Sequence, residues 1–352
     1  MTRGWIGLST DELVAEVAGL GEPGYRGKQL ATWLYRKNRV VLDEMTDLPR
    51  GLREKLATRP VGELSLVRDQ VATDGTRKFL FDTLAGGMVE SVFMPSAERS
   101  SVCVSTQVGC AVACAFCETG LSGFQRDLSA GEIVEQVLAI QRLTGERVTH
   151  VVFMGMGEPL FNMDATLKAV ALLNGEVGIG MRHLTISTSG VVPAIDRLAE
   201  HDLQLTLAIS LHAAEDGLRD VLVPLNRRFP LEQLKEAAQR YENRTGRRIT
   251  IEYVLLDGVN DQRSHAEACA TWLRGIHAHV NLIPFNATEA AFAPSRPEAI
   301  RQFRQILEGA GFPVTVRVER GAEIAAACGQ LRRQALKAAG EIVPLRKRGA
   351  EA

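Results

Sequence analysis

The chain has 352 residues, more than one ordinary domain requires, so its length predicts one large domain with one or two smaller ones. With 41 Lys and Arg against 42 Asp and Glu, the formal net charge is −1, which excludes a uniformly polycationic protein but allows local basic patches. The sequence has no secretory signal pattern, no apolar run of about 18 residues and only six cysteines, so we expect a cytoplasmic protein with no membrane span and no disulfide scaffold.

Residues 1–62 are predicted to form a small helical domain. Ser9 precedes apolar residues at helical spacing, Gly24 interrupts that pattern, and a second helix is expected to begin near Gln29. Between Arg26 and Arg59 nine Lys or Arg accompany four acids. This local excess of positive charge indicates either a functional basic surface or an ordinary solvated face.

Residues 63–99 are predicted to form a β-hairpin extension. Alternating segments at 78–82 and 89–93 flank the Gly86-Gly87 step, which is typical of a hairpin turn. Glu90 lies on the second strand, and the alternation by itself predicts that its side chain faces solvent.

Strand, loop and helix patterns alternate from residue 100 to about residue 320. Six βα units in roughly 210 residues favour an α/β fold, either a partial parallel barrel or an open doubly wound sheet. Helices are expected at 130–142, 231–245 and 262–273. Strands are expected at 102–107, 149–154, 183–187, 205–210, 250–255 and 280–284. Residues 321–352 are expected to hold a cysteine loop and a basic tail.

Three cysteines, Cys110, Cys114 and Cys117, form a C-x3-C-x2-C motif in a loop after the first strand of this region. Thiolates at this spacing can converge on one soft metal centre. A structural zinc site would require a fourth ligand, and no nearby His or Cys forms the second ligand pair that such sites use. Three cysteines suit a [4Fe-4S] cluster with one iron open to a ligand. Buried structural cysteines are the alternative.

Several further segments surround this motif in a recognisable order. They are CVSTQVGC at 103–110, FMGMGEP at 153–159, STSG at 187–190, SLH at 210–212, NLIPFN at 281–286 and ACGQL at 327–331, with YRGKQL at 25–30 and WLY at 33–35. Together they resemble the radical SAM superfamily and, within it, the RlmN/Cfr type of RNA adenine methyltransferase. The resemblance implies a partial (β/α)6 radical SAM barrel over 100–320, with the helical accessory domain and the β-hairpin extension before it.

The resemblance also implies a set of cofactor ligands. Cys110, Cys114 and Cys117 would hold the [4Fe-4S] cluster, and S-adenosylmethionine (SAM) would bind its open iron. The residues implied to contact SAM are Gly157, Glu158, Ser187, Ser210, Leu211, His212 and Asn286.

Three catalytic residues are implied in the same way. Cys328 would carry the transferred methyl group, Cys103 would resolve the RNA adduct by forming a disulfide with Cys328, and Glu90 would accept the proton from the adenine. This last role overturns the solvent-facing interpretation of Glu90.

Cys269 matches no motif and is expected in the core. The chain departs from the family at Glu118 and lacks two acids shortly before Cys328, which puts substrate preference in doubt.

The implied substrates are an adenosine in 23S rRNA near the peptidyl-transferase centre and the adenosine 3′ of the tRNA anticodon, each methylated at C2. The basic helical domain and tail, including Arg26, Lys28, Arg332 and Arg333, would contact phosphates. We further expect a monomer served by a flavodoxin- or ferredoxin-type electron donor. Two alternatives stay open: C8 methylation of rRNA that confers antibiotic resistance, and a non-catalytic RNA-binding protein with a structural metal.

Overall fold

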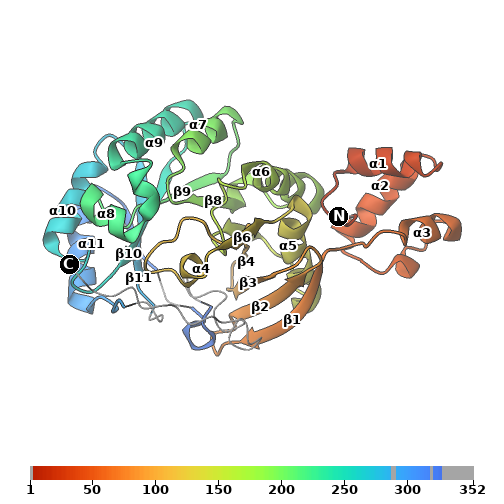
Figure 1. Ribbon diagram of the computed structural model, residues 1–352, viewed down its shortest axis with the longest axis horizontal. Helices are drawn as coiled ribbons and strands as arrows, with labels where there is room; N and C mark the ends of the chain where they lie inside the picture. The colour runs from red at the N-terminus through yellow and green to blue at the C-terminus, as the bar shows by residue number, and fades with distance from the viewer. Residues whose placement is uncertain (1–2, 287–290, 318–319, 327–352) are drawn as a thin grey trace.

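The computed structural model describes residues 3–286, 291–317 and 320–326 (Figure 1). Cys328, Arg332 and Arg333 therefore lie outside the described residues. A helical module at the N-terminus stands beside a large α/β unit built on one curved sheet (Figure 1). Within the described ranges, no helix is long and apolar enough to cross a membrane.

The N-terminal module contains α1 (Thr10–Gly19), α2 (Tyr25–Ala31), a π-helical turn (Thr32–Arg36) and α3 (Arg50–Leu56). A capping box begins α1, because Ser9 Oγ accepts from the Glu12 N–H and the Glu12 carboxylate accepts from the Ser9 N–H. The second helix begins at Tyr25, earlier than the predicted start near Gln29. Gly27 does not interrupt it: a Cβ at this position would lie 2.5 Å from Val14 Cα, so glycine permits the close crossing of α1 and α2.

The β-extension has three strands rather than the two of the predicted hairpin. They are β1 (Leu64–Val71), β2 (Arg77–Thr83) and β3 (Met88–Pro95), and they pair in antiparallel order. The extension is continuous with the rest of the sheet, since β3 also pairs antiparallel with β4 (Ser100–Cys103).

All six predicted parallel strands are present, so the expectation of an α/β partial barrel is confirmed. After β4 they are β7 (His150–Phe153), β8 (Leu184–Thr188), β9 (Thr206–Ser210), β10 (Ile249–Leu255) and β11 (Ala278–Pro284). A short seventh strand, β12 (Val314–Val316), pairs parallel to β11 and was not predicted. The order in the sheet is β1-β2-β3-β4-β7-β8-β9-β10-β11-β12.

The predicted strand at 102–107 is wrong in its second half. The strand ends at Cys103, and β5 (Gln107–Gly109) pairs instead with β6 (Phe124–Asp127) in a separate two-stranded sheet. The buried Ser105 causes the change of direction, because its N–H donates to Gln136 Oε1 and its hydroxyl donates to the Glu90 carbonyl. The chain thereby turns towards the cysteine motif.

Helices cover the outer face of the parallel strands (Figure 1). The three predicted helices correspond to α5 (Ala130–Thr144), α9 (Leu231–Thr245) and α10 (Arg263–Trp272), and Cys269 is buried in α10 as expected. The remaining helices are α4 (Glu118–Leu121), α6 (Met163–Leu172), α7 (Val192–Glu200), α8 (Asp216–Leu222) and α11 (Pro297–Gly309).

Two glycines join the N-terminal module to the barrel. A Cβ on Gly7, whose φ is +105°, would lie 2.6 Å from Gly131 Cα, and a Cβ on Gly131 would lie 2.5 Å from the Ile6 carbonyl oxygen. Gly131 is in the first turn of α5. The module and α5 therefore meet backbone to backbone, at a distance that no side chain allows.

We expect Gly131→Ala to lower the free energy of unfolding by about 1–3 kcal/mol, because the added methyl group forces this contact apart. Gly51→Ala is the matched control: Gly51 lies in α3 with no atom within 4 Å of the added Cβ, so alanine should stabilise the helix by up to about 1 kcal/mol. Denaturant unfolding of the two variants measures both effects. Equal stability of Gly131→Ala and the parent would contradict the close contact.

Candidate active site

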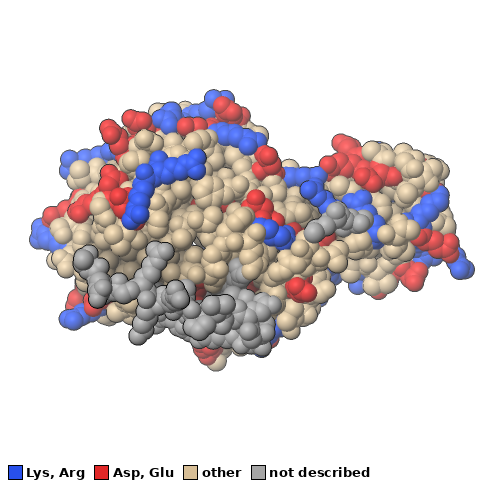
Figure 2. Space-filling view, viewed as in Figure 1, with Lys and Arg blue, Asp and Glu red and all other residues tan. Residues whose placement is uncertain are grey.

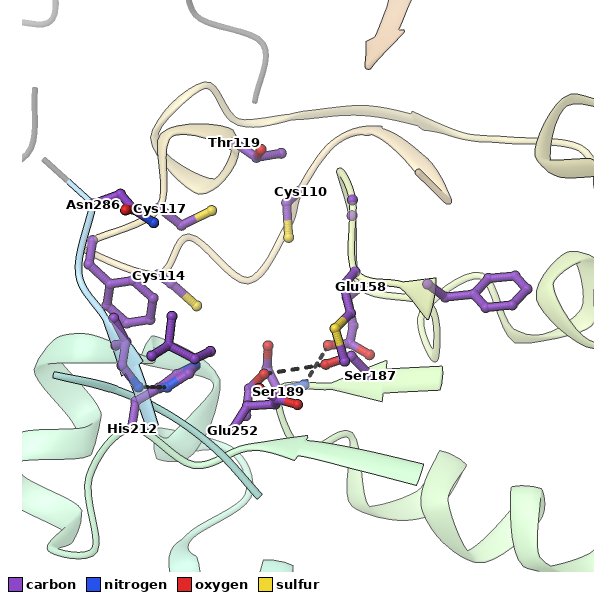
Figure 3. Close-up of a pocket in the computed structure, with 18 of the residues that line it drawn as sticks. Cys110, Cys114, Cys117, Thr119, Glu158, Ser187, Ser189, His212, Glu252 and Asn286 are labelled. Carbon is purple, nitrogen blue, oxygen red and sulfur yellow. Dashed lines mark hydrogen bonds between the residues drawn. The ribbon is translucent and has the colours of Figure 1, made fainter. Parts of the chain in front are cut away.

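One cavity of about 150 Å³ lies where the carboxyl ends of the parallel strands face the cysteine loop (Figure 3). Parallel barrels collect their functional groups at this end of the sheet. Six of the seven predicted SAM contacts line the cavity together with the three cysteines of the motif. Those six are Gly157, Glu158, Ser187, Ser210, His212 and Asn286.

Leu211 is the exception among the predicted contacts. Its side chain is fully buried, and it is not among the described residues that line the cavity. Its N–H donates to the Glu252 carbonyl and its own carbonyl accepts from Arg219 Nε, so the main chain of Leu211 holds the end of β9 in place.

The cysteine loop crosses above the strand ends, with the three sulfur-bearing side chains pointing into the cavity (Figure 3). The Cys110 N–H donates to the Gly123 carbonyl, and the Cys117 N–H donates to the Cys114 carbonyl. Gly120 lies against the loop so closely that a Cβ there would be 2.9 Å from the Cys114 nitrogen. These contacts define the path of a loop that has little regular structure of its own.

Burial dominates the chemistry of these thiols. It raises the pKa of Cys110 to about 12 and the pKa of Cys114 well above its usual value, and the negative charges of neighbouring cysteines add to both shifts. Thiolates here therefore require a cation to compensate them. No group of three or more His, Cys, Asp or Glu among the described residues is arranged to hold a single metal ion.

The segment that follows β7 forms the opposite wall of the cavity. The Gly155 N–H donates to the Val104 carbonyl, and the Met156 carbonyl accepts from the Thr106 N–H. Gly157 has φ +103°, and a Cβ there would lie 2.6 Å from Gln107 Cβ. Glycine is thus required at position 157 both by the backbone conformation and by this close approach.

Glu158 is a buried carboxylate fixed at the cavity wall. Oε2 accepts from the Ser189 N–H at 2.7 Å, and Oε1 accepts from the Leu160 N–H at 3.1 Å. Burial raises the pKa of Glu158, and these two N–H donors oppose that shift because they favour the ionised form. The result is a preorganised carboxylate at the cavity wall, which suits a cationic ligand.

Two hydroxyls and an imidazole add to the polar lining of the cavity. Ser187 Oγ and Ser210 Oγ lie 3.4 Å apart at the ends of the neighbouring strands β8 and β9. His212 Nδ1 accepts from the Val254 N–H at 3.0 Å, so Nδ1 carries no proton and Nε2 is the available donor. The Phe116 ring meets the imidazole edge-on at 4.9 Å.

A buried arginine behind the cavity was missed by the sequence analysis. Arg219 donates to the carbonyls of Ser189, Ser210 and Leu211 and to Asn226 Oδ1. Burial lowers its pKa to about 10, so it stays a cation at neutral pH. Its position on a short helix gave no motif signal.

Glu252 was also missed, although an acid within the apolar strand Ile249–Leu255 was an available signal. Its carboxylate lines the cavity and accepts from Asn281 Nδ2, with Arg317 Nη1 4.0 Å from its second oxygen.

Two of the three predicted catalytic residues, Glu90 on β3 and Cys103 on β4, lie within the described part of the chain. Glu90 is 2% exposed, so the solvent-facing interpretation from the alternation is wrong: both faces of this strand are covered. The Glu90 N–H donates to Met156 Sδ at 3.4 Å, beside the Gly157 turn.

Cys103 is buried at the end of β4. Ser101, two residues earlier, lines a second cavity of about 440 Å³ that adjoins the first, so Cys103 faces the barrel interior.

The basic excess of the N-terminal module is partly neutralised. Five of its nine cations lie within 4.0 Å of an acid: Arg39, Arg50, Arg53, Lys55 and Arg59. Lys28 is exposed, whereas Arg26 is half-buried and donates to the Asp47 carbonyl. Lys and Arg alternate with Asp and Glu over the visible face of the module (Figure 2).

Comparisons with known proteins agree with this geometry. The sequence profile of the Radical SAM superfamily matches residues 104–268, and that of the ribosomal RNA large subunit methyltransferase N-terminal domain matches residues 5–61. A probable dual-specificity RNA methyltransferase RlmN from Thermosynechococcus vestitus is 49% identical over 332 residues, covering 94% of this chain and 98% of the relative. A protein of the same name from Symbiobacterium thermophilum is 48% identical over 338 residues, covering 94% and 91%.

A solved structure is similar over the same extent. The crystal structure of a radical SAM methyltransferase from Sphaerobacter thermophilus matches with a TM-score of 0.91 at 50% sequence identity. The match covers 94% of this chain and 99% of the other.

The environment of His212 predicts a pH effect on stability. Burial, assisted by the positive charge of Arg219, lowers the pKa of His212 to about 3. The unfolded chain takes up a proton below about pH 6.5 and the folded chain does not, so this residue destabilises the fold as pH falls. We expect His212→Gln, which keeps an acceptor for Val254, to gain up to about 1.4 kcal/mol relative to the parent for each pH unit below 6.5. A pH-independent difference in unfolding free energy would contradict a neutral His212.

Proposed function

Because the chain belongs to the RlmN family of radical SAM RNA methyltransferases, we propose that it methylates carbon 2 of adenosine in 23S rRNA and in tRNA. The observation that carries the proposal is the convergence of Cys110, Cys114 and Cys117 on one cavity with Glu158 and the strand-end hydroxyls. A non-catalytic RNA-binding protein with a structural metal does not fit a full-length match to these enzymes. The C8 alternative is not favoured, since the relatives carry the RlmN name.

The described residues fit the cofactors of the radical SAM superfamily. Three thiols that line one cavity, where burial makes thiolates depend on a compensating cation, suit the three-cysteine ligation of a [4Fe-4S] cluster. When bound, the cluster and SAM supply a methyl group in one turnover step and an organic radical in another. Glu158 would hold the amino group of SAM, and Gly157 leaves room for it beside the turn. Ser187, Ser210, His212 and Asn286 would bind its remaining polar atoms.

Three residues of the chain would handle the adenine. Cys328, as a thiolate, would take the methyl group, since C2 of adenine is too electron-poor to attack SAM itself. After the methyl carbon is joined to C2, the Glu90 carboxylate would accept the C2 proton. The Cys103 thiolate would then attack the Cys328 sulfur. The S–S bond would form as the bond from that sulfur to the methyl-derived carbon breaks, and this carbon would keep the electron pair and take up a proton, which completes the methyl group of the released RNA. Cys103 and Glu90 both lie on strands next to the cavity wall, which supports these roles.

The substrate has to reach the cavity as an unstacked base, so loops and single strands are favoured over duplex RNA. We infer that the enzyme acts in the cytoplasm, where these RNAs are made. We also infer that it acts as a monomer and receives electrons from a flavodoxin- or ferredoxin-type donor. Nucleoside mass spectrometry of 23S rRNA and tRNA after reaction with the reconstituted protein tests the regiochemistry. 2-Methyladenosine in both RNAs is expected, and 8-methyladenosine would refute the assignment.

The two cysteines outside the cluster motif should fail at different steps. Cys103→Ala should still load a methyl group on Cys328 and form the RNA adduct, then stall with RNA attached, because the resolving thiolate is missing. Cys328→Ala should form no adduct, because it has no methyl group to donate. Denaturing gels with and without ribonuclease detect the adduct, and Cys269→Ala is the control because Cys269 is a core residue. Parent-rate release of methylated RNA by Cys103→Ala would refute its role.

Phosphate contacts by the basic residues predict a change in salt dependence. Replacing Arg26, Lys28, Arg332 and Arg333 with Gln should weaken RNA binding at low salt. The slope of log affinity against log salt should flatten by roughly 0.7 to 0.9 per lost contact. Arg50→Gln is the matched control, since Arg50 is already paired with Glu54 at 2.9 Å. An unchanged slope in the fourfold variant would show that these residues form only a solvated face.

A further inference from the structure

Lys78 on β2 is a buried lysine to which the proposed chemistry gives no role. Only 2% of its surface is exposed, and a buried ammonium is retained only where other groups compensate its charge. Its Nζ lies 3.7 Å from Glu90 Oε1 and donates a 3.1 Å hydrogen bond to the Ala325 carbonyl. Burial lowers the pKa of Lys78, and the negative charge of Glu90 opposes the shift. One side chain thus joins Glu90 to the segment that precedes Cys328.

The strand register places Lys78 on the same face as both residues proposed to act on the adduct. Lys78 pairs with Val92 on β3, and Val92 pairs with Cys103 on β4. Directly paired residues project from the same face of a sheet, as do residues two apart on one strand. Lys78, Glu90 and Cys103 therefore project from one face.

The segment 320–326 is held against the β-extension near that face. It lies beside the ends of β1 and β2 in Figure 1, where it is drawn in blue. Gly321 has φ +61°, and a Cβ there would lie 2.8 Å from Thr76 Cγ2, so the backbone of the segment meets the β1–β2 turn closely. The hydrogen bonds that join them run from Arg320 Nη1 to the Pro95 carbonyl, from the Gly321 N–H to Asp74 Oδ2 and from the Thr73 N–H to the Glu323 carboxylate.

We propose that Lys78 is a positioning residue, which keeps the Glu90 carboxylate ionised and fixes the segment leading to Cys328 beside it. This inference rests on the proposed function, in which Glu90 accepts the C2 proton and Cys328 carries the methyl group. An ammonium 3.7 Å away favours the ionised form of a buried carboxylate, and only that form can accept a proton. The bond to Ala325 lies three residues before Cys328 in the sequence, so the same cation contacts the base and orders the described segment that leads to the carrier.

The first test compares Lys78→Met with Arg77→Met in the cluster-loaded protein, using SAM and a transcribed 23S rRNA fragment. Arg77 is the adjacent residue on β2, and it pairs with Asp69 on β1 outside the site. Lys78→Met should still load methyl on Cys328, as seen by peptide mass spectrometry, but form 2-methyladenosine at least tenfold more slowly at pH 7. Its rate should rise with pH, because Glu90 without the cation ionises only at higher pH. Arg77→Met should keep the parent rate and pH profile, and Lys78→Arg should restore most of the rate.

The second test needs no cofactor and no RNA. Hydrogen exchange at the Ala326 amide, which donates to the Gly321 carbonyl, reports the order of the segment. Lys78→Met should speed this exchange, whereas Glu90→Gln should not, since the bond from Lys78 to Ala325 persists. If Lys78→Met does not fold, Lys78→Gln serves in its place, because glutamine keeps a hydrogen-bond donor but carries no charge. The pH profile of methylation should then shift, while hydrogen exchange at the Ala326 amide stays near the parent rate.

The outcomes separate this inference from the proposed function. The absence of 2-methyladenosine with the parent protein would refute the proposed function. A full methylation rate in Glu90→Gln would refute only Glu90 as the proton acceptor, and with it the role of Lys78 towards Glu90. A slow Glu90→Gln together with a Lys78→Met protein of parent rate, pH profile and exchange would overturn the role of Lys78 alone. A rate loss in Lys78→Met that is the same at every pH would also overturn it, because a merely structural defect does not move the pH profile.

Discussion

The site depends on the close contact between two backbone segments, 104–107 after β4 and 155–158 after β7. Hydrogen bonds join Gly155 to Val104 and Thr106 to Met156, and Gly157 lies too close to Gln107 for any side chain. The cysteine loop follows the first segment and Glu158 ends the second. The contact is buried and so tightly packed that the two segments cannot shift relative to each other. It therefore fixes the distance between the cysteine thiols and the Glu158 carboxylate before any ligand binds.

Buried polar groups behind the cavity maintain this arrangement. Arg219 donates to three carbonyls at the ends of β8 and β9, and two backbone N–H groups hold Glu158. Such interactions act in surroundings of low polarity, where an unmet hydrogen bond is costly, so each side chain has one favourable orientation. The site is therefore ordered in part by groups behind the cavity, and Arg219 among them belongs to no motif in the sequence.

The sequence predicted the barrel well because parallel strands are apolar runs separated by helices with clear spacing. Motifs, rather than periodicity, also singled out six residues that lie together in one cavity, among the seven predicted to contact SAM. It failed where tertiary contacts override local pattern. Alternation assigned Glu90 to the solvent, yet a covering layer buries it beside Lys78. The spacing also placed the start of the second helix near Gln29, whereas it begins at Tyr25, where Gly27 permits a close crossing with α1. Short strands such as β12 have too few residues to show a period.

The continuous sheet has a consequence for how an RNA can be selected. β3 pairs with both β2 and β4, and the N-terminal module is fixed to α5 by Gly7 and Gly131, so the two ends of the molecule form one stiff body. A stiff body has a constant span between the outer module and the cavity. If the module contacts the phosphates of a stem as proposed, selection by span asks only that an RNA place that stem and an unstacked adenosine at the matching separation. Two RNAs with unrelated sequences can meet that requirement equally, without any base in the stem being read.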